Sequence, residues 1–214
     1  MSAPQAPPAF QQLHGSAAAT KGPCQSRGMR TRAARPDDDA AIDAVVGAAF
    51  GDEGPVIVRL LGLLAAAGHR RASLVAEQDG ALVGHVQLSR SWVDARERLV
   101  EVLVLSPLSV LPEAQGRGVG TALVAAALDR AAALGAPAVF LEGSPDYYGR
   151  HGFVRASELG FTRPSVRIPD VACQVALLPG YQSWMAGALV YCDPFWVTDA
   201  VGLRDPLLAE WETP

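Results

Sequence analysis

The spacing of apolar residues changes repeatedly after residue 28, and each change predicts an element. In three segments apolar residues recur every three or four positions, which is the period of a helix packed on one side. These predicted helices are 37–50, 53–67 and 119–134. Shorter stretches rich in β-branched and other apolar residues predict strands instead. The predicted strands are 29–34, 73–78, 81–90, 99–111, 138–141, 172–178 and 187–191.

The strands at 73–78 and 81–90 are joined by Asp79-Gly80, a dipeptide typical of a two-residue hairpin turn. Polar and apolar residues alternate along the second strand, so one face of the hairpin is polar. His85 lies on that face, where we expect it to be solvated.

The order of the elements, a hairpin followed by strand, helix and strand and then by more strands, predicts a mixed α/β fold (α+β, with a mixed sheet). We expect residues 29–214 to form a single domain. Residues 1–28 consist mainly of Ala, Pro, Gly, Ser and Gln without an acidic residue, which predicts a disordered N-terminal extension. The last stretch, 192–214, either wraps the core or reaches a second subunit to form a homodimer.

Composition excludes several classes of protein. The net charge of −4 over 214 residues argues against a nucleic-acid partner, and no run of eighteen apolar residues predicts a membrane span. Lys21, in the extension, is the only lysine, so the domain has no catalytic lysine. Three cysteines without a C-x-x-C pair and four histidines without ligand spacing predict neither disulfides nor a metal site. We therefore expect a cytoplasmic protein.

The sharpest motif is Gln115-Gly116-Arg117-Gly118-Val119-Gly120, between the strand at 99–111 and the helix at 119–134. Glycines lack Cβ atoms, so a ligand can approach the backbone closely. The free N–H groups and the positive end of the helix dipole would point into this loop, which favours a pyrophosphate. The alternative is a plain strand-to-helix turn.

Three known phosphate loops can be compared with this motif. A Walker A loop needs a lysine, and the dinucleotide fingerprint needs a glycine at the position of Thr121, so neither fits. The G-x-G-x-G of nucleoside-dependent methyltransferases does match Gly116, Gly118 and Gly120. Glu142 also stands where such folds place a ribose-binding acid, although it could hydrogen-bond the following loop instead.

Two features argue against the methyltransferase interpretation. Ser106-Pro107 interrupts the strand that precedes the loop, and proline predicts a bulge because it donates no ladder hydrogen bond. A bulge there would open a wedge beside the strand at 138–141, and the unpaired backbone groups would suit a ligand with amides, such as pantetheine. The glycine loop also comes late in the chain, whereas a Rossmann-type fold opens with it.

Together these motifs resemble a known superfamily. Pro112-x-x-Gln115-Gly116-x-Gly118-Val119-Gly120, preceded by Leu108-Ser109-Val110, is similar to motif A of the GNAT acyltransferases. The stretch 142–153, EGSPDYYGRHGF, resembles the G-D-P-x-Y-Y-x-R-x-G-F segment of the YhbS-like branch, with Ser144 where aspartate is usual.

The resemblance implies a GNAT-like fold, in which a central, mostly antiparallel sheet contains a splayed parallel strand pair and is flanked by helices. It also implies an N-acetyltransferase that uses acetyl-CoA as co-substrate and needs no metal. The acceptor would be an amine of a small molecule or a protein, which attacks the thioester directly in a ternary complex. One alternative is a CoA-binding sensor or interaction module that has lost turnover; a methyltransferase is the other.

The resemblance also assigns roles to residues. Backbone groups of Leu108, Ser109 and Val110 would bind pantetheine. Tyr148 matches the tyrosine that protonates the departing CoA thiolate, and its alternative is a core aromatic. Glu101 is the acid nearest to the expected bulge and could take the amine proton, unless it is a solvated charge at the strand end. The residues that would hold the pyrophosphate are Gln115, Gly116, Arg117, Gly118, Val119, Gly120 and Thr121.

Overall fold

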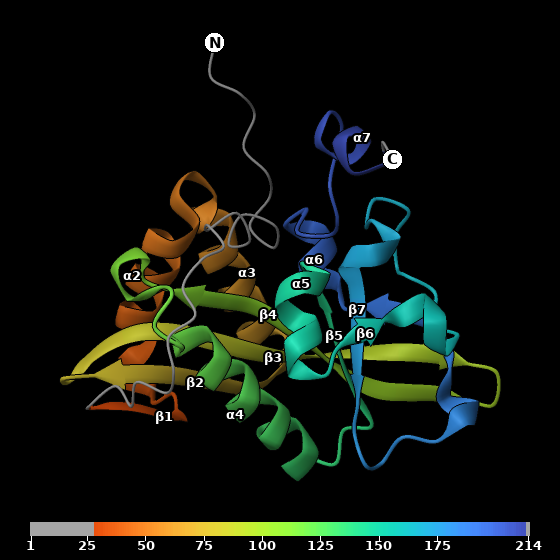
Figure 1. Cartoon of the computed structure of the whole chain (residues 1–214), viewed down its shortest axis with the longest axis horizontal. Helices are drawn as coiled ribbons and strands as arrows, with labels where there is room; N and C mark the ends of the chain where they lie inside the picture. Colours follow the sequence, from red (N-terminus) through yellow and green to blue (C-terminus); the bar gives the residue numbers. More distant parts are fainter. Residues whose placement is uncertain (1–27, 213–214) are drawn as a thin grey trace.

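The computed structural model describes residues 28–212 (Figure 1). The expected disordered extension therefore lies, apart from Gly28, outside the described residues. The described residues form an eight-stranded sheet in the order β1-β2-β3-β4-β5-β7-β6, with β8 paired to β3. The strands are β1 (Met29–Ala33), β2 (Arg70–Gln78), β3 (Ala81–Ala95), β4 (Leu99–Val110), β5 (Ala138–Glu142), β6 (Val154–Arg155), β7 (Cys173–Leu177) and β8 (Gly187–Tyr191).

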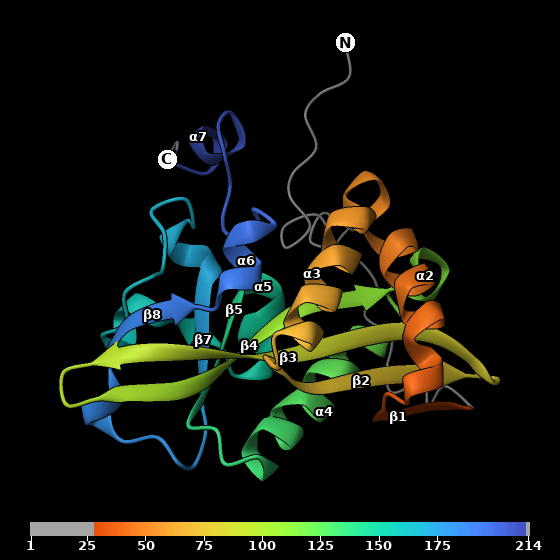
Figure 2. The same ribbon diagram turned by 180° about the vertical axis from the view of Figure 1, so that it is seen from behind.

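Helices cover both faces of this sheet. Helices α2 (Asp39–Phe50) and α3 (Gly54–Ala66) lie on one face, and α4 (Val119–Ala133) lies on the other (Figure 2). The alternation of strand side chains divides the core accordingly: Leu74 of β2 packs with the α4 side, and its neighbour Val75 packs with α2 and α3. All three helices were predicted from periodicity, and their ends agree to within a few residues.

The polar face of the β2–β3 hairpin is not solvated, so this expectation was wrong. His85 is only 1% exposed because it points to the face that α2 and α3 cover. Its Nε2 lies 2.9 Å from the Ser73 hydroxyl oxygen, at hydrogen-bond distance. Burial, together with the charge of Arg70, lowers the pKa of His85 to about 4.

The predicted bulge in β4 is confirmed. Val86 pairs with Leu108 and Leu88 with Leu105, so one residue of β3 faces the two residues Ser106 and Pro107. Beyond the bulge β4 leaves its other neighbour. Only two residue pairs, Leu103 with Val139 and Val104 with Phe140, join β4 to β5. The two strands therefore splay apart toward their C-terminal ends.

The β4–β5 pair is parallel, and every other strand pair among the described residues is antiparallel. This mixed sheet confirms the predicted fold class. It is incompatible with the doubly wound parallel sheet that the methyltransferase alternative requires. The predicted hairpin turn is also confirmed, since Asp79 and Gly80 have φ values of 51° and 84°.

Two strands extend beyond their predicted ends. Strand β2 begins at Arg70, and β3 continues through residues 91–95, where β4 flanks it on one side and β8 on the other. The partners of this extension lie far along the chain, so local periodicity did not reveal it. The edge strand β6 is only two residues long and was not predicted.

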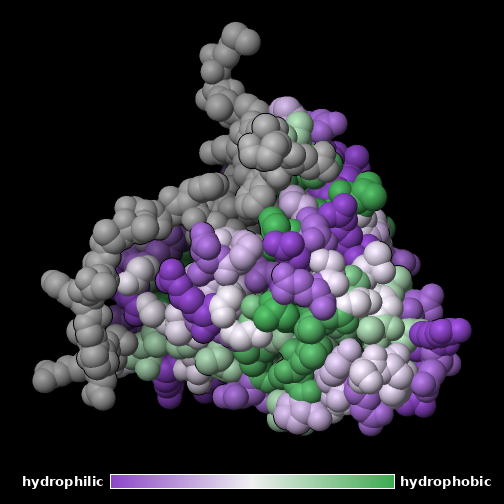
Figure 3. Space-filling view, turned by 45° about the vertical axis from the view of Figure 1, so that its right-hand side comes forward, coloured by the Kyte–Doolittle hydropathy of each residue, from purple (hydrophilic) through white to green (hydrophobic). Residues whose placement is uncertain are grey.

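The C-terminal stretch packs on the core as far as residue 203, which agrees with the first of the two alternatives, a segment that wraps the core. Phe195 of α6 (Asp193–Val197), Val201 and Leu203 are almost fully buried. Helix α7 (Leu207–Glu212) follows. On the side of the molecule shown in Figure 3, apolar residues gather in a central patch between polar areas.

No helix between residues 28 and 212 is both long and apolar enough to cross a membrane. Within the same residues, no group of three or more His, Cys, Asp or Glu side chains is placed to hold a metal ion. Cys173 and Cys192 are buried free thiols.

Candidate active site

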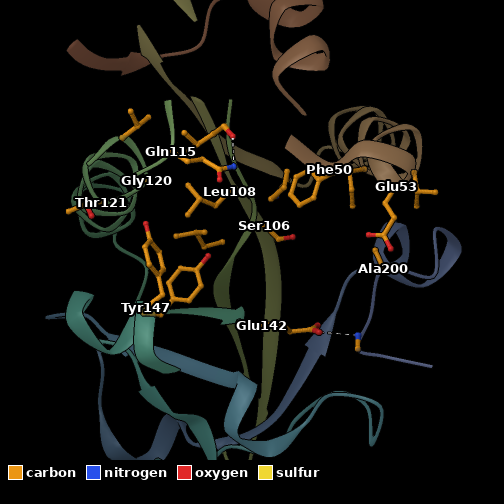
Figure 4. A pocket seen from close by; sticks show the side chains of 18 of the residues that line it. Phe50, Glu53, Ser106, Leu108, Gln115, Gly120, Thr121, Glu142, Tyr147 and Ala200 are labelled. Carbon is orange, nitrogen blue, oxygen red and sulfur yellow. Dashed lines mark hydrogen bonds between the residues drawn. The ribbon is translucent and has the colours of Figure 1, made fainter. Parts of the chain in front are cut away.

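A cavity of about 800 Å³ opens where β4 and β5 separate (Figure 4). Its walls come from four parts of the chain that are far apart in sequence. One wall is the bulged end of β4, and a second is the glycine loop with the first turn of α4. The third is the connection between α2 and α3, and the fourth combines the end of β5, α5 (Pro145–Tyr148) and a C-terminal segment.

The glycine loop has the geometry expected for an anion site. Gly116 and Gly118 adopt positive φ values of 70° and 84°, which favour glycine, and α4 begins directly afterwards at Val119. The side-chain amide of Gln115 donates a hydrogen bond of 3.1 Å to the carbonyl of Val110. That bond ties the loop to the end of β4, so Gln115 supports the loop.

All residues expected to hold the cofactor line the cavity except Ser109 and Arg117. Along β4, Ser109 points to the opposite face from Leu108 and Val110 and is fully buried there. Arg117 is exposed, between two glycines whose backbone turns it outward. The structure therefore separates these two side chains from the rest of the predicted cofactor site.

Both tyrosines of α5, Tyr147 and Tyr148, line the cavity. Tyr147 points toward Gly120 and Thr121 (Figure 4). Its hydroxyl lies so close to Gly120 that a Cβ atom at this position would collide with it. Burial raises the pKa of the Tyr147 phenol, and a hydrogen bond with Thr121 partly offsets that rise. Tyr147 thus forms part of the loop end of the cavity.

Tyr148 is 8% exposed and is held on three sides. Its ring lies against Gly143, where a Cβ atom would overlap it, and makes edge contacts with Tyr147 at 4.9 Å and Phe153 at 5.8 Å. Burial raises the pKa of the Tyr148 phenol well above its ordinary value. The phenol is therefore protonated throughout the physiological range and is a hydrogen-bond donor in the cavity wall.

Glu101 does not line the cavity. Its carboxylate forms ion pairs of 2.9 Å with Arg71 and Arg90 on the exposed part of the sheet. It pairs with Trp92 in β3, five residues before the bulge, where the strands have not yet separated. This geometry matches the alternative for Glu101, a solvated strand charge.

Glu142 is the acid that lies at the splay, the region of the cavity where β4 and β5 separate. It is the last residue of β5, and one of its carboxylate oxygens accepts a hydrogen bond of 2.9 Å from the Gly202 amide. Burial raises the pKa of Glu142 to about 7, although the Gly202 N–H, Tyr191 and Arg167 all act in the opposite direction. The sequence placed Glu142 at the end of the wedge strand but did not indicate this proton affinity.

The sequence did not indicate Glu53 as a residue of the site. It ends the short turn between α2 and α3 and lines the cavity, with one carboxylate oxygen buried and without a hydrogen-bond partner. Burial and the adjacent Asp52 raise the pKa of Glu53 to about 7. No motif marks this residue, because the turn reaches the cavity only through the packing of the two helices.

The C-terminal segment was also missed. Thr198, Asp199, Ala200 and Gly202 line the cavity, near the end of β5. Arg150 completes the lining, and it is the only cation among the described residues that do so. Its neighbour His151 lies in the turn that follows α5, with its ring 5.2 Å from that of Tyr147.

Comparison with known proteins identifies the family. The family model for the acetyltransferase (GNAT) family matches residues 47–161, which contain the glycine loop, the bulge and both tyrosines. The chain belongs to the GNAT acetyltransferase family. It is thus an acyl-CoA-dependent acetyltransferase, as the resemblance implied.

Individual relatives agree with this assignment. Over 137 residues the GNAT enzyme is 32% identical to the uncharacterized N-acetyltransferase YjhQ of Escherichia coli K12, a match that covers 63% of this chain and 69% of that protein. The structure of YhbS from E. coli in complex with CoA superposes with a TM-score of 0.71 at 25% identity, covering 82% of this chain and 96% of that one. A GNAT acetyltransferase from Brucella melitensis in complex with acetyl-CoA gives a TM-score of 0.64 at 29% identity, covering 78% and 97%.

Proposed function

We propose that this GNAT enzyme transfers an acetyl group from acetyl-CoA to an amine by direct attack within a ternary complex. The observation that carries the proposal is the cavity itself, which joins a glycine loop at a helix N-terminus to a pair of splayed parallel strands. The complexes of YhbS with CoA and of the Brucella enzyme with acetyl-CoA support this choice of co-substrate.

The two halves of the cavity suit the two parts of CoA. Backbone groups of Leu108 and Val110 lie beyond the point where β5 pairs with β4, so they are available to the amides of pantetheine. The N–H groups from Gly116 to Thr121, at the start of α4, would hold the pyrophosphate. Arg150 supplies a positive charge to the same cavity.

Tyr148 would donate a hydrogen bond to the sulfur as the thioester breaks. The proposal has the amine nitrogen form a bond to the carbonyl carbon while the carbon–sulfur bond breaks and its electrons pass to sulfur. The thiolate then takes the phenolic proton. The apolar surroundings that raise the pKa of Tyr148 would also raise that of the CoA thiol, because both anions lose hydration there.

Glu142 would take the proton that the amine loses. If the β4–β5 register continued past Val104 and Phe140, Glu142 would stand opposite Ser106, across the space where the strands separate. Both residues line the cavity. With a pKa near 7, the carboxylate of Glu142 is a stronger base than an exposed glutamate, and near neutral pH a substantial fraction of it is ionised.

Thermal unfolding of the full chain with acetyl-CoA, S-adenosylmethionine or NAD tests the co-substrate. A ligand at one hundred times its Kd adds about 2.7 kcal/mol to the free energy of unfolding, which raises Tm by about 5–11 °C in a domain of this size. We expect acetyl-CoA alone to do so. Release of free CoA in the presence of an amine then separates an enzyme from a CoA-binding module, which would show the shift without turnover.

A further inference from the structure

The cavity has a second end, away from the glycine loop. Glu53, Ala200 and Glu142 lie on the opposite side of the cavity from Gly120 and Thr121 (Figure 4). If CoA occupies the loop and the splay, the acceptor enters from this end. The residues here are therefore those that select it.

Apolar side chains line this end of the cavity together with Glu53. Phe50 comes from α2, and Val56 and Ile57 come from α3. The two helices approach closely at the turn: a Cβ atom on Gly54 would collide with the backbone of Gly47. The turn that carries Glu53 is thus held by tight packing and presents the carboxyl to the cavity at a fixed place.

The acids in this part of the cavity differ in their partners. Asp199 is neutralised by Arg204 at 2.6 Å and by Arg167 at 3.3 Å. Glu142 accepts a hydrogen bond from the backbone amide of Gly202. Glu53 has a buried carboxylate oxygen with no hydrogen-bond partner. Arg150, the only cation among the described residues of the lining, lies in the turn that follows α5.

Leaving a buried carboxylate oxygen unpaired is unfavourable, because the group loses hydration and receives nothing in return. A protonated nitrogen on the ligand would supply the missing partner. The reacting amine cannot be that nitrogen, since it must be neutral to attack and must reach the splay beside Glu142. The partner for Glu53 must therefore be a second group on the same acceptor.

We propose that Glu53 binds a second, protonated nitrogen of the acceptor, and hence that the acceptors are diamines. Their carbon chain passes Phe50 and Ile57, which line the same end of the cavity, and the distal ammonium donates to the Glu53 carboxylate. This inference rests on the proposed function, because it places the reacting amine at the splay.

The experiment compares acetylation of 1,4-diaminobutane with that of n-butylamine, which has the same carbon chain and lacks the second nitrogen. We expect the wild-type kcat/KM to be at least tenfold higher for the diamine. In Glu53→Gln the ratio of kcat/KM for the diamine to kcat/KM for butylamine should fall to about one. Asp52→Asn is the matched control: it removes the same charge one residue away, on an exposed side chain that does not line the cavity. Because the Asp52 charge raises the pKa of Glu53, its removal leaves Glu53 more ionised and should not weaken the preference for the diamine.

Any of four results would overturn the inference: equal wild-type rates for the two amines, an equal loss for both amines in Glu53→Gln, the same effect in Asp52→Asn, or a protein that acetylates other amines but neither of these two. Stabilisation by acetyl-CoA without turnover of any amine contradicts the proposed function instead. Absence of stabilisation by acetyl-CoA has a different meaning, because it contradicts the proposed function and not the choice of acceptor.

Discussion

Glu142, the last residue of β5, accepts a hydrogen bond of 2.9 Å from the backbone N–H of Gly202 in the C-terminal segment. The bond joins the end of β5 to the C-terminal segment within one wall of the cavity, and the structure records no backbone donor for the second carboxylate oxygen of Glu142 among the described residues. It fixes the carboxyl beside the splay while the surroundings raise its pKa to about 7. A single residue thus both holds the C-terminal segment and presents a base.

Replacement of this base should change the pH profile of the enzyme. Below pH 7 the Glu142 carboxyl is protonated and cannot take a proton, so the wild-type kcat/KM should fall as the pH is lowered through this value. Glu142→Gln keeps an oxygen for the Gly202 amide but has no proton affinity, and we expect a loss of about 100-fold at pH 8. The ratio of wild-type to variant rates cancels the ionisation of the substrate amine and should itself decline below pH 7.

Glu101→Gln is the control for this measurement, because Glu101 is an acid of the neighbouring strand that pairs with Arg71 and Arg90 outside the cavity. Its kcat/KM should match that of the wild type at every pH. A pH-independent ratio for Glu142→Gln, or a large loss in Glu101→Gln, would contradict the assignment of the base to Glu142.

The adjacent tyrosines allow a matched test of the acid. Tyr148→Phe removes the donor to the leaving sulfur, and kcat should fall about 100-fold while stabilisation by acetyl-CoA is kept. Tyr147→Phe removes a hydroxyl that lies against Gly120 at the loop end, so it should alter acetyl-CoA affinity more than kcat. Steady-state kinetics of both variants, with the thermal shift by acetyl-CoA, separate these roles. An unchanged kcat in Tyr148→Phe would remove its role as the acid.

The sequence predicted the glycine loop and the bulge at one end of the cavity and not the residues at the other end, for a physical reason. Closely spaced glycines before a helix and a proline inside a strand are local signals, because backbone conformation and hydrogen bonding depend on the residues themselves. Gly118 therefore predicted the loop, and Pro107 predicted the bulge. Glu53 and Gly202 reach the cavity only because helices and the chain end pack around it, and nothing in their neighbourhood encodes that approach.

His85 and Glu101 also show what local sequence patterns cannot predict. Alternation along β3 correctly placed His85 on a polar face, but it could not show that two helices cover this face. Glu101 lies on the correct strand, yet it precedes the point after Val104 at which β4 and β5 separate. Pattern gives the face and order of residues, whereas access to a cavity depends on tertiary packing.

Gly202 offers a test of the C-terminal wall. It has a φ of 61°, and a Cβ atom here would collide with the backbone of Arg167, so Gly202→Ala must displace the segment. We expect the free energy of unfolding to fall by about 1–3 kcal/mol. We also expect kcat/KM for the amine to decrease while acetyl-CoA still stabilises the variant, because the glycine loop is untouched.

Gly62→Ala is the control for backbone effects. Gly62 lies in α3 with open space around its Cβ position, and this change should raise the free energy of unfolding by about 0.5–1 kcal/mol without affecting turnover. Chemical denaturation and initial-rate assays measure both quantities. Normal amine kinetics in Gly202→Ala would show that the C-terminal segment does not shape the acceptor end.

The buried His85 should make the enzyme less stable in weak acid. The folded chain keeps this imidazole neutral down to about pH 4, whereas the unfolded chain protonates it near pH 6.5. Between these values the unfolded state binds more protons, so the free energy of unfolding falls as the pH is lowered, by roughly 3 kcal/mol for this residue alone.

The raised pKa values of Glu53 and Glu142 act in the opposite direction over an overlapping range, since these groups favour the folded state once they are protonated. The total pH dependence of stability therefore mixes several groups, among them His151, whose pKa is lowered by burial and by Arg150. The comparison must be made against His85→Gln, which retains the other groups and offers an amide to Ser73. Urea unfolding at pH 7.5, 6 and 4.5 should show the wild type losing stability relative to this variant at each step downward. A constant difference across the three pH values would mean that His85 accepts a proton in the folded state as readily as in the unfolded chain, which its burial beneath α2 and α3 should prevent.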